Sequence, residues 1–265
     1  NRGGMACFAL TEPGAGSDAG AVSCRAEKVE GGYILNGTKC FITNAPIADK
    51  ITLFANTREG GGIRGLTVFL VDADTKGISI GKEEDKMGIR ASATAEIIFE
   101  DCFVPDSALV GKEGRGFMIA MQTLQMSRPV VAAISVGIAQ AAIEAAVAYS
   151  HHRKQFGVKI ATFEMVQQMI ADMVMKTEAA RILTYKACVA QMNKDKKAGL
   201  YSAMSKCFAS DTAMEVTTTA VQVMGGNGYS RENPVEKYMR DAKIMQIYEG
   251  TNQVQRLVIA NEATF

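Results

Sequence analysis

The stretch 114–121 reads GRGFMIAM, and here the pattern of the chain changes from strands to helices. Beyond it, apolar residues recur at spacings of three and four or their sums, which predicts a long helix from about Arg115 to His151. The apolar positions are Phe117, Met121, Leu124, Val131, Ile138 and Ala145. Further helices are expected at about residues 162–193, 199–224 and 234–244, and a last one after Gly250.

The part of the chain before Gly114 is rich in short apolar runs that alternate with turn signals. We expect strands at residues 51–55, 66–71 and 95–100, and a flexible glycine-rich loop at 57–65. Asn36-Gly37 lies between two strand-like runs, and this dipeptide favours the type I′ turn of a hairpin. Strands followed by helices predict an α+β fold of two units, residues 1–112 and 113–265, and not a βαβ nucleotide fold.

Composition excludes several classes of function. With 29 basic and 28 acidic residues the net charge is +1, so the chain has no nucleic-acid footprint. The six cysteines form no C-x-x-C pair, which favours a reducing compartment and argues against structural zinc. The only histidines, His151 and His152, are adjacent, so we expect no metal site. We expect no apolar run long enough to span a membrane and no signal sequence.

Glu249 is the candidate catalytic residue, within MQIYEGTNQ at 245–253. Its apolar neighbours Ile247 and Tyr248 would partly desolvate the carboxylate, which favours a role as general base. Gly250 would let a ligand approach the backbone. From these residues alone, an acidic group that complements a helix dipole is an equal alternative.

Other polar segments also have two interpretations. TEPGAGSD at 11–18 could cradle a phosphate through backbone N–H groups or be a plain surface turn. Arg128 lies on the apolar face of the first long helix, where it needs either a ligand or a structural ion pair. RKQFG at 153–157 could recognise a phosphate or only compensate a helix dipole.

Five motifs together resemble the FAD-dependent acyl-CoA dehydrogenase family. They are ALTEPGAGSD at 9–18, FITN at 41–44, RKQFG at 153–157, QVMGG at 222–226 and IYEGT at 247–251. The resemblance covers essentially the whole chain and implies a middle antiparallel, barrel-like β-domain followed by a C-terminal four-helix bundle. It also implies that the family's N-terminal helical domain, of roughly a hundred residues or more, is missing here.

The resemblance implies α,β-dehydrogenation of an acyl-CoA thioester in fatty acid β-oxidation. Glu249 matches the family's base, which removes the α-proton while the β-hydrogen leaves as hydride to flavin N5, giving a trans-2-enoyl-CoA. The thioester oxygen would be stabilised by the backbone N–H at the Glu249 position and a ribityl hydroxyl of FAD. Some relatives carry the base near the position of Ser127 instead, so Glu249 favours the short- or medium-chain and butyryl-CoA type over the isovaleryl type.

The resemblance also assigns binding residues. Residues that match cofactor contacts are Leu10, Thr11, Ser17, Phe41, Ile42, Thr43, Arg153, Phe156, Gln222, Gly225, Gly226, Thr251, Asn252 and Gln253. Those that match the substrate-binding segments are Ser17, Gln125, Met126, Ser127, Arg128 and Gly250. Gln125 stands where the family commonly has Asp, and Glu164 stands where a glutamine often contacts FAD.

The implied partners are acyl-CoA, electron-transfer flavoprotein and further copies of the chain. Arg153 and Phe156 match residues that reach the FAD of a neighbouring subunit, which implies a homo-oligomer such as a dimer of dimers. The implied location is the bacterial cytoplasm, or the mitochondrial matrix in a eukaryote. An enoyl-CoA reductase that runs the same site in reverse, and a non-catalytic binding module that lacks the first domain, are the alternatives.

Overall fold

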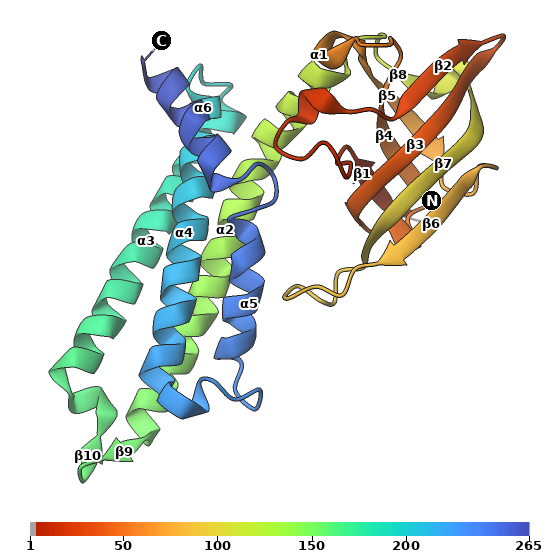
Figure 1. Ribbon diagram of the computed structural model, residues 1–265. Helices are drawn as coiled ribbons and strands as arrows, with labels where there is room; N and C mark the ends of the chain where they lie inside the picture. The colour runs from red at the N-terminus through yellow and green to blue at the C-terminus, as the bar shows by residue number, and fades with distance from the viewer. Residues whose placement is uncertain (1–3, 265) are drawn as a thin grey trace. The chain divides into compact units, whose positions relative to one another are not determined.

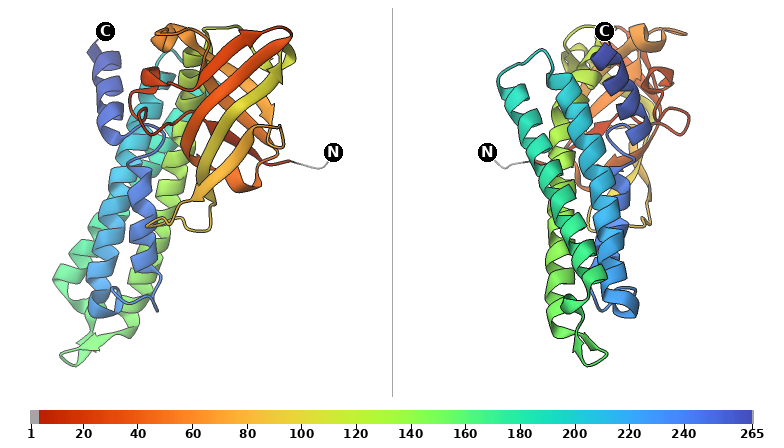
Figure 2. Two further views of the ribbon diagram at one scale, coloured as in Figure 1. Left: turned by 45° about the vertical axis from the view of Figure 1, so that its right-hand side comes forward. Right: turned by 90° about the vertical axis from the view of Figure 1, so that its left-hand side faces the viewer.

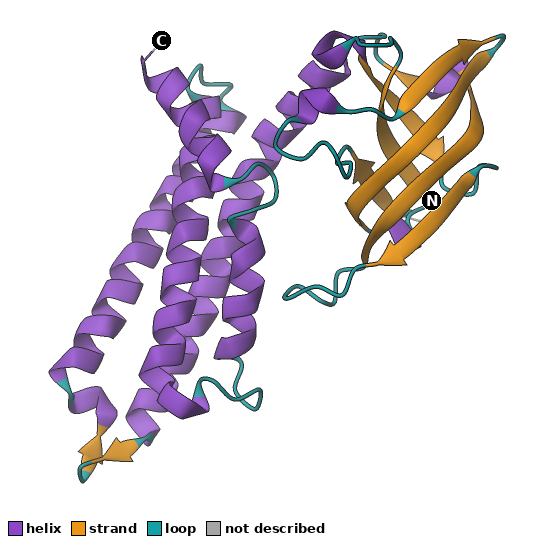
Figure 3. Cartoon of the chain, in the orientation of Figure 1, coloured by secondary structure: helices purple, strands orange, loops and turns teal. Residues whose placement is uncertain are grey.

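The computed structural model describes residues 4–264 and divides into two compact units. The β unit comprises the chain up to Lys86 together with Arg90–Gln122, and the helical unit comprises Met87–Ile89 and the chain from Thr123 onward. Figure 3 shows the large sheet in the first and the long helices, with one small hairpin, in the second. The predicted α+β order, with a β-domain before a helical bundle, is confirmed.

The β unit contains one eight-stranded sheet in the order β6-β7-β3-β2-β4-β5-β8, with β1 paired to β4 (Figure 1). Neighbouring strands are antiparallel except for the parallel pairs β1–β4 and β2–β4, so the sheet is mixed. Its strands are β1 Ala6–Ala9, β2 Arg25–Val29, β3 Gly32–Thr43, β4 Lys50–Asn56, β5 Leu66–Asp72, β6 Ile78–Glu83, β7 Thr94–Pro105 and β8 Leu109–Val110. A short helix, α1 (Gly62–Gly65), lies in the expected 57–65 loop.

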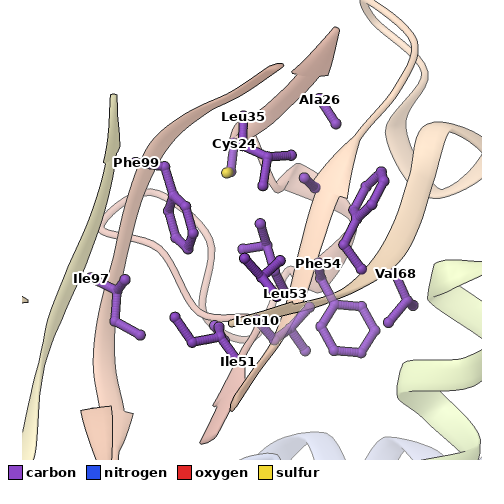
Figure 4. Close-up of a cluster of buried hydrophobic side chains, with 14 of the residues drawn as sticks. Leu10, Cys24, Ala26, Leu35, Ile51, Leu53, Phe54, Val68, Ile97 and Phe99 are labelled. Atoms are coloured by element: carbon purple, nitrogen blue, oxygen red, sulfur yellow. The ribbon is translucent and has the colours of Figure 1, made fainter. Parts of the chain in front are cut away.

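Apolar side chains from β3, β4 and β7 form the core of the β unit. Leu35, Leu53 and Phe99 point toward one another in Figure 4, and each is at most 2% exposed. Phe54 lies on the same strand as Leu53 and is also fully buried, so both faces of β4 are covered. Removal of this apolar surface from water is the main stabilising contribution to the unit.

The hairpin predicted at Asn36-Gly37 is wrong, because β3 continues through both residues. The chain turns earlier, between β2 and β3, where Gly31 has a φ of 74°. Asn36 instead pairs with Asp101 of β7, accepting its backbone N–H at 2.8 Å. A Cβ on Gly37 would lie 2.8 Å from Cys24 Cα, so glycine serves a close approach of two strands here and not a turn.

In the helical unit, α2 to α5 run alongside one another, as the views of Figures 1 and 2 agree, and the expected four-helix bundle is confirmed. The helices are α2 Gly116–His152, α3 Glu164–Met192, α4 Ala198–Met224, α5 Val235–Met245 and α6 Asn252–Thr264. A small hairpin, β9 Lys154–Gln155 and β10 Val158–Lys159, connects α2 toward α3. The buried faces are rich in alanine, including Ala142, Ala146, Ala213 and Ala220, which lets the helices pack closely.

By length and composition, α2 alone among the helices of residues 4–264 could cross a membrane. The expectation that no stretch reaches this length is therefore wrong by that measure. In the part of α2 that meets the criterion, 44% of the residues are buried inside the structure, and core helices of soluble proteins pass the same test.

A buried ion pair links the first loop of the β unit to β3. Lys39 Nζ lies 2.7 Å from Glu12 Oε1, and these side chains are 0% and 3% exposed. Glu12 also accepts hydrogen bonds from the backbone N–H groups of Ser23 and Cys24. Burial alone would raise the pKa of Glu12, but the Lys39 ammonium and the Ser23 donors hold it below its ordinary value.

We predict that Lys39→Met lowers the free energy of unfolding of the β unit by about 3–5 kcal/mol, because it leaves a buried carboxylate without its counter-charge. Urea unfolding followed by circular dichroism measures the loss. Lys50→Met is the matched control, since the Lys50–Asp72 pair is about half exposed and should contribute less than about 1 kcal/mol. Equal losses in the two variants would contradict the prediction.

Stability should also depend on pH through Glu12. Because the folded state lowers the Glu12 pKa, the contribution is present above the ordinary value of 4.5 and is lost as pH falls through the lower folded value. The stability difference between the wild type and Glu12→Gln should therefore shrink as pH is lowered from 7 to 3. Glu27→Gln, at a side chain that is 62% exposed, should show a small difference at every pH.

Candidate functional site

The loop between α5 and α6 carries Glu249 in a left-handed conformation. Glu249 has a φ of 56° and Gly250 a φ of 86°, so two consecutive residues lie in this region. A non-glycine residue pays on the order of 1–3 kcal/mol to remain there, and such residues cluster at active sites. The turn places the Glu249 carboxylate 2.6 Å from Ser127 Oγ of α2.

The Glu249 carboxylate is half-buried and has one hydroxyl donor, so it remains free to accept a proton from a ligand. The neighbouring Tyr248 turns inward, and its hydroxyl lies 3.0 Å from Met245 Sδ. Burial, with a smaller effect from the Glu249 charge, raises the pKa of Tyr248 to about 12. Tyr248 therefore stays neutral beside the carboxylate at physiological pH.

Two buried side chains that sequence reasoning missed hold the inner side of this loop. Lys206 of α4 donates from Nζ to the Gly250 carbonyl at 2.8 Å and to Asn252 Oδ1 at 2.9 Å. Gln255 of α6 donates from Nε2 to the carbonyls of Glu249 and Gly250. Lys206 could have been found from the sequence, because a lysine at a core position of the predicted 199–224 helix needs hydrogen-bond partners.

The polar residues that follow Glu249 differ in whether their side chains face the bundle or the solvent. The Asn252 amide is buried and bonds to Lys206, Ser210 and Asp211, so its side chain is committed to α4. Thr251 is half-buried, and its hydroxyl accepts the backbone N–H of Val254 in the first turn of α6. Gln253 is exposed. Cofactor contacts by these residues stay predictions.

Arg128 is 7% exposed, and its Nε has no hydrogen-bond partner. Within residues 4–264 no carboxylate forms an ion pair with it at 4 Å or less, so the structural ion pair left open by the sequence is not formed there. Burial lowers the Arg128 pKa, while the charges of Glu249 and Glu262 act in the opposite direction. An orphaned donor beside the candidate base is what a ligand contact would require.

The rest of the predicted substrate-binding stretch lies on the same helix. Gln125 and Ser127 are half-buried, and Met126 is 68% exposed. The Gln125 carbonyl accepts Nε2 of Gln191 from α3. The stretch is therefore anchored to the bundle and still offers side chains to solvent.

A cavity of about 430 Å³ at one end of the bundle brings together four predicted cofactor residues: Arg153, Phe156, Gly225 and Gly226. Phe156 is 95% exposed, has a φ of 51°, and lies edge-on to Phe163 with ring centroids 6.1 Å apart. A Cβ on Gly225 or Gly226 would meet nothing within 4 Å, so the backbone there is open to a ligand. Gln222 is exposed on the last turn of α4 and does not line the cavity.

In the β unit the structure brings the two predicted flavin segments together. Lys39 Nζ donates to the Leu10 carbonyl at 3.0 Å, and the Cys40 N–H donates to the Thr11 carbonyl at 3.0 Å. A bulge in β3 then gives Phe41 a φ of 55° and leaves it 64% exposed. The segment thus presents an exposed aromatic ring directly after the residue that bonds to Thr11.

The other members of these segments alternate between core and surface. Ile42 is 2% exposed and belongs to the core, whereas Thr43 and Ser17 are exposed. Leu10 is 8% exposed, and Thr11 is half-buried.

A larger cavity of the β unit, about 560 Å³, lies against Arg25, Lys28 and Arg58 and contains none of the predicted site residues. No group of three His, Cys, Asp or Glu side chains in the described chain is placed to hold a metal.

Comparisons with known proteins agree with the motifs. The family model for the acyl-CoA dehydrogenase C-terminal domain matches residues 114–264, and the model for the middle domain matches residues 7–102. A probable acyl-CoA dehydrogenase from Mycobacterium tuberculosis is 50% identical over 258 residues, which are 97% of this chain and 66% of that protein. Cyclohex-1-ene-1-carbonyl-CoA dehydrogenase of Syntrophus aciditrophicus is 49% identical over 261 residues, 98% of this chain and 63% of that one.

Solved structures resemble this chain in both fold and sequence. Butyryl-CoA dehydrogenase from Megasphaera elsdenii superimposes with a TM-score of 0.97 at 47% identity, covering 99% of this chain and 68% of that one. A chain in a structure of the electron transferring flavoprotein of Acidaminococcus fermentans gives 0.96 at 51% identity, covering 98% and 68%. The chain belongs to the acyl-CoA dehydrogenase family. It spans just under two thirds of the length of the first mycobacterial relatives, 66%.

We predict that Arg128→Met changes the free energy of unfolding by less than about 1 kcal/mol, although the side chain is buried. The substitution removes an unpaired, desolvated cation and fills the space with an apolar chain of similar length. Thermal and urea unfolding measure the change. A loss of about 3 kcal/mol or more would mean that Arg128 is a structural ion-pair partner and not a ligand contact.

Proposed function

We propose that this protein is a flavin-dependent acyl-CoA dehydrogenase in which Glu249 removes the α-proton of an acyl-CoA thioester. The observation that carries the proposal is the left-handed Glu249-Gly250 turn, which presents a half-buried carboxylate with Ser127 as its only side-chain hydrogen-bond partner in the described structure. The family membership and the relatives named as acyl-CoA dehydrogenases support it.

The residues present fit a large, flat cofactor such as FAD. Taken unit by unit, Phe41 is an exposed aromatic ring of the β unit, and in the helical unit Phe156 is exposed and the Gly225-Gly226 backbone is open at a 430 Å³ cavity. Exposed aromatic surface suits a flat ring system, and a glycine backbone with open space beside it lets a bulky pyrophosphate approach closely. When bound, FAD would supply the two-electron oxidation by accepting the β-hydrogen.

The chain's own groups would do the proton chemistry. Glu249 would accept the α-proton, and Ser127 would orient its carboxylate through the 2.6 Å hydrogen bond. The backbone N–H of Glu249 would donate to the thioester oxygen as charge develops there. The Arg128 guanidinium, which lacks a partner at Nε, would stabilise negative charge on the bound thioester.

We further propose that electrons pass to an electron-transfer flavoprotein, which the similarity to a chain in the Acidaminococcus structure supports. A homo-oligomer is proposed because α3 exposes a stripe of apolar side chains at helical spacing: Met175, Ile182, Tyr185, Val189 and Met192. The location is the bacterial cytoplasm, or the mitochondrial matrix in a eukaryote. An enoyl-CoA reductase would use the same residues in reverse, and the potential of the electron acceptor would decide the direction.

Glu249→Gln tests the proposal. It keeps the size of the side chain and removes the proton acceptor, so bleaching of the flavin absorbance by butyryl-CoA under anaerobic conditions should slow by about 100-fold or more. The visible spectrum of bound FAD should be unchanged. Bleaching at the wild-type rate would remove Glu249 from the mechanism.

A further inference from the structure

We propose that Lys206 and Gln255 are positioning residues for the Glu249 base: as buried donors they hold the Glu249 and Gly250 carbonyls and so maintain the left-handed turn. The inference rests on the proposed function of Glu249. It assigns a role to two residues that lie outside the motifs and outside the predicted substrate and cofactor contacts.

The contacts are specific to the loop that bears the base. Lys206 Nζ lies 2.8 Å from the Gly250 oxygen, and Gln255 Nε2 lies 3.1 Å from the same oxygen and 3.2 Å from the Glu249 oxygen. Both donor residues are 0% exposed. Removal of a donor would leave its carbonyl facing an apolar side chain, which carries the desolvation penalty of an unsatisfied polar group, so the carbonyls depend on these side chains.

The turn needs an external constraint because its conformation is unfavourable for glutamate. A Glu249 residue with φ of 56° would relax toward the ordinary negative-φ regions unless its carbonyl were fixed. Such a rotation would move the carboxylate away from Ser127 Oγ. Gly250 is also required for this arrangement, since a Cβ at that position would lie 2.4 Å from Gln255 Nε2.

If the stability of the core were the only requirement, apolar side chains would serve better than Lys206 and Gln255. Gln255 Oε1 has no hydrogen-bond partner within residues 4–264, so half of the amide is unsatisfied while the other half serves the loop. Desolvation lowers the pKa of Lys206 to about 8, with Cys207, Asp211 and Glu249 favouring the charged form and Arg128 opposing it. Polar groups kept at such a cost indicate a functional constraint.

The test uses Lys206→Met and Gln255→Met, which keep side-chain length and remove the donors. In anaerobic rapid mixing of the FAD-loaded protein with butyryl-CoA, the bleaching rate constant should fall by about 100-fold, the effect expected of a misplaced catalytic group. The dissociation constant of butyryl-CoA and the FAD content should stay near the wild-type values. A purely structural role would instead lower FAD content and substrate affinity together with the rate.

Two controls separate the effect from general damage. Lys186→Met makes the same chemical change at an exposed position of α3, and Thr217→Val removes a buried hydroxyl of α4 that bonds only within its own helix. Both should bleach at the wild-type rate. The two donors lie on different helices, so Gln255→Met provides the test if Lys206→Met does not fold.

Glu249→Gln is measured in parallel to separate this inference from the proposed function. If Glu249→Gln does not bleach while both donor variants bleach at the wild-type rate, the positioning role is overturned and the base assignment stands. If Glu249→Gln bleaches normally, both fail together. Slow bleaching in the donor variants, with binding intact, supports the inference.

Discussion

A buried lysine that donates to a backbone carbonyl fixes a predicted site segment in each unit. In the β unit Lys39 binds the Leu10 carbonyl, and in the helical unit Lys206 binds the Gly250 carbonyl. Both lysines are 0% exposed. A buried ammonium must be hydrogen-bonded or neutralised, so it holds a loop more tightly than a solvent-exposed donor can.

The two lysines have different kinds of partner. Lys39 has a full counter-charge, because Glu12 lies 2.7 Å away and is itself satisfied by two backbone N–H groups. Lys206 has only carbonyl and amide oxygens at hydrogen-bond distance, and burial lowers its pKa to about 8. The loop of the β unit is thus anchored by an ion pair, whereas the loop of the base is anchored by a lysine that binds only uncharged oxygens at hydrogen-bond distance.

Much of the helical unit could be predicted from the sequence, since apolar periodicity extends over the long helices α2, α3 and α4 and averages out local exceptions. Asn36-Gly37 shows the opposite case: a two-residue signal for a turn was overridden by the pairing of β3 with β7. The motif residues were found because together they resemble one family, and Arg128 was found because a cation on an apolar helix face needs a partner. Lys206 offered only the signal of a lysine at a core position, and Gln255 offered none. The carbonyls that these two residues bind could not be named, because only the fold brings donors and carbonyls together.

Three of the predicted site residues, Phe41, Phe156 and Glu249, share a left-handed backbone that non-glycine residues rarely adopt. In each case the conformation exposes or aims a side chain that an ordinary backbone would direct elsewhere: an aromatic ring at a strand bulge, a ring beside a cavity, and a carboxylate beside Ser127. Sequence shows none of this strain, since the residue types are ordinary. At Glu249 the conformation persists because the buried donors Lys206 and Gln255 hold the carbonyls of the loop, so the rigidity of the bundle is itself a condition for an accurately placed base.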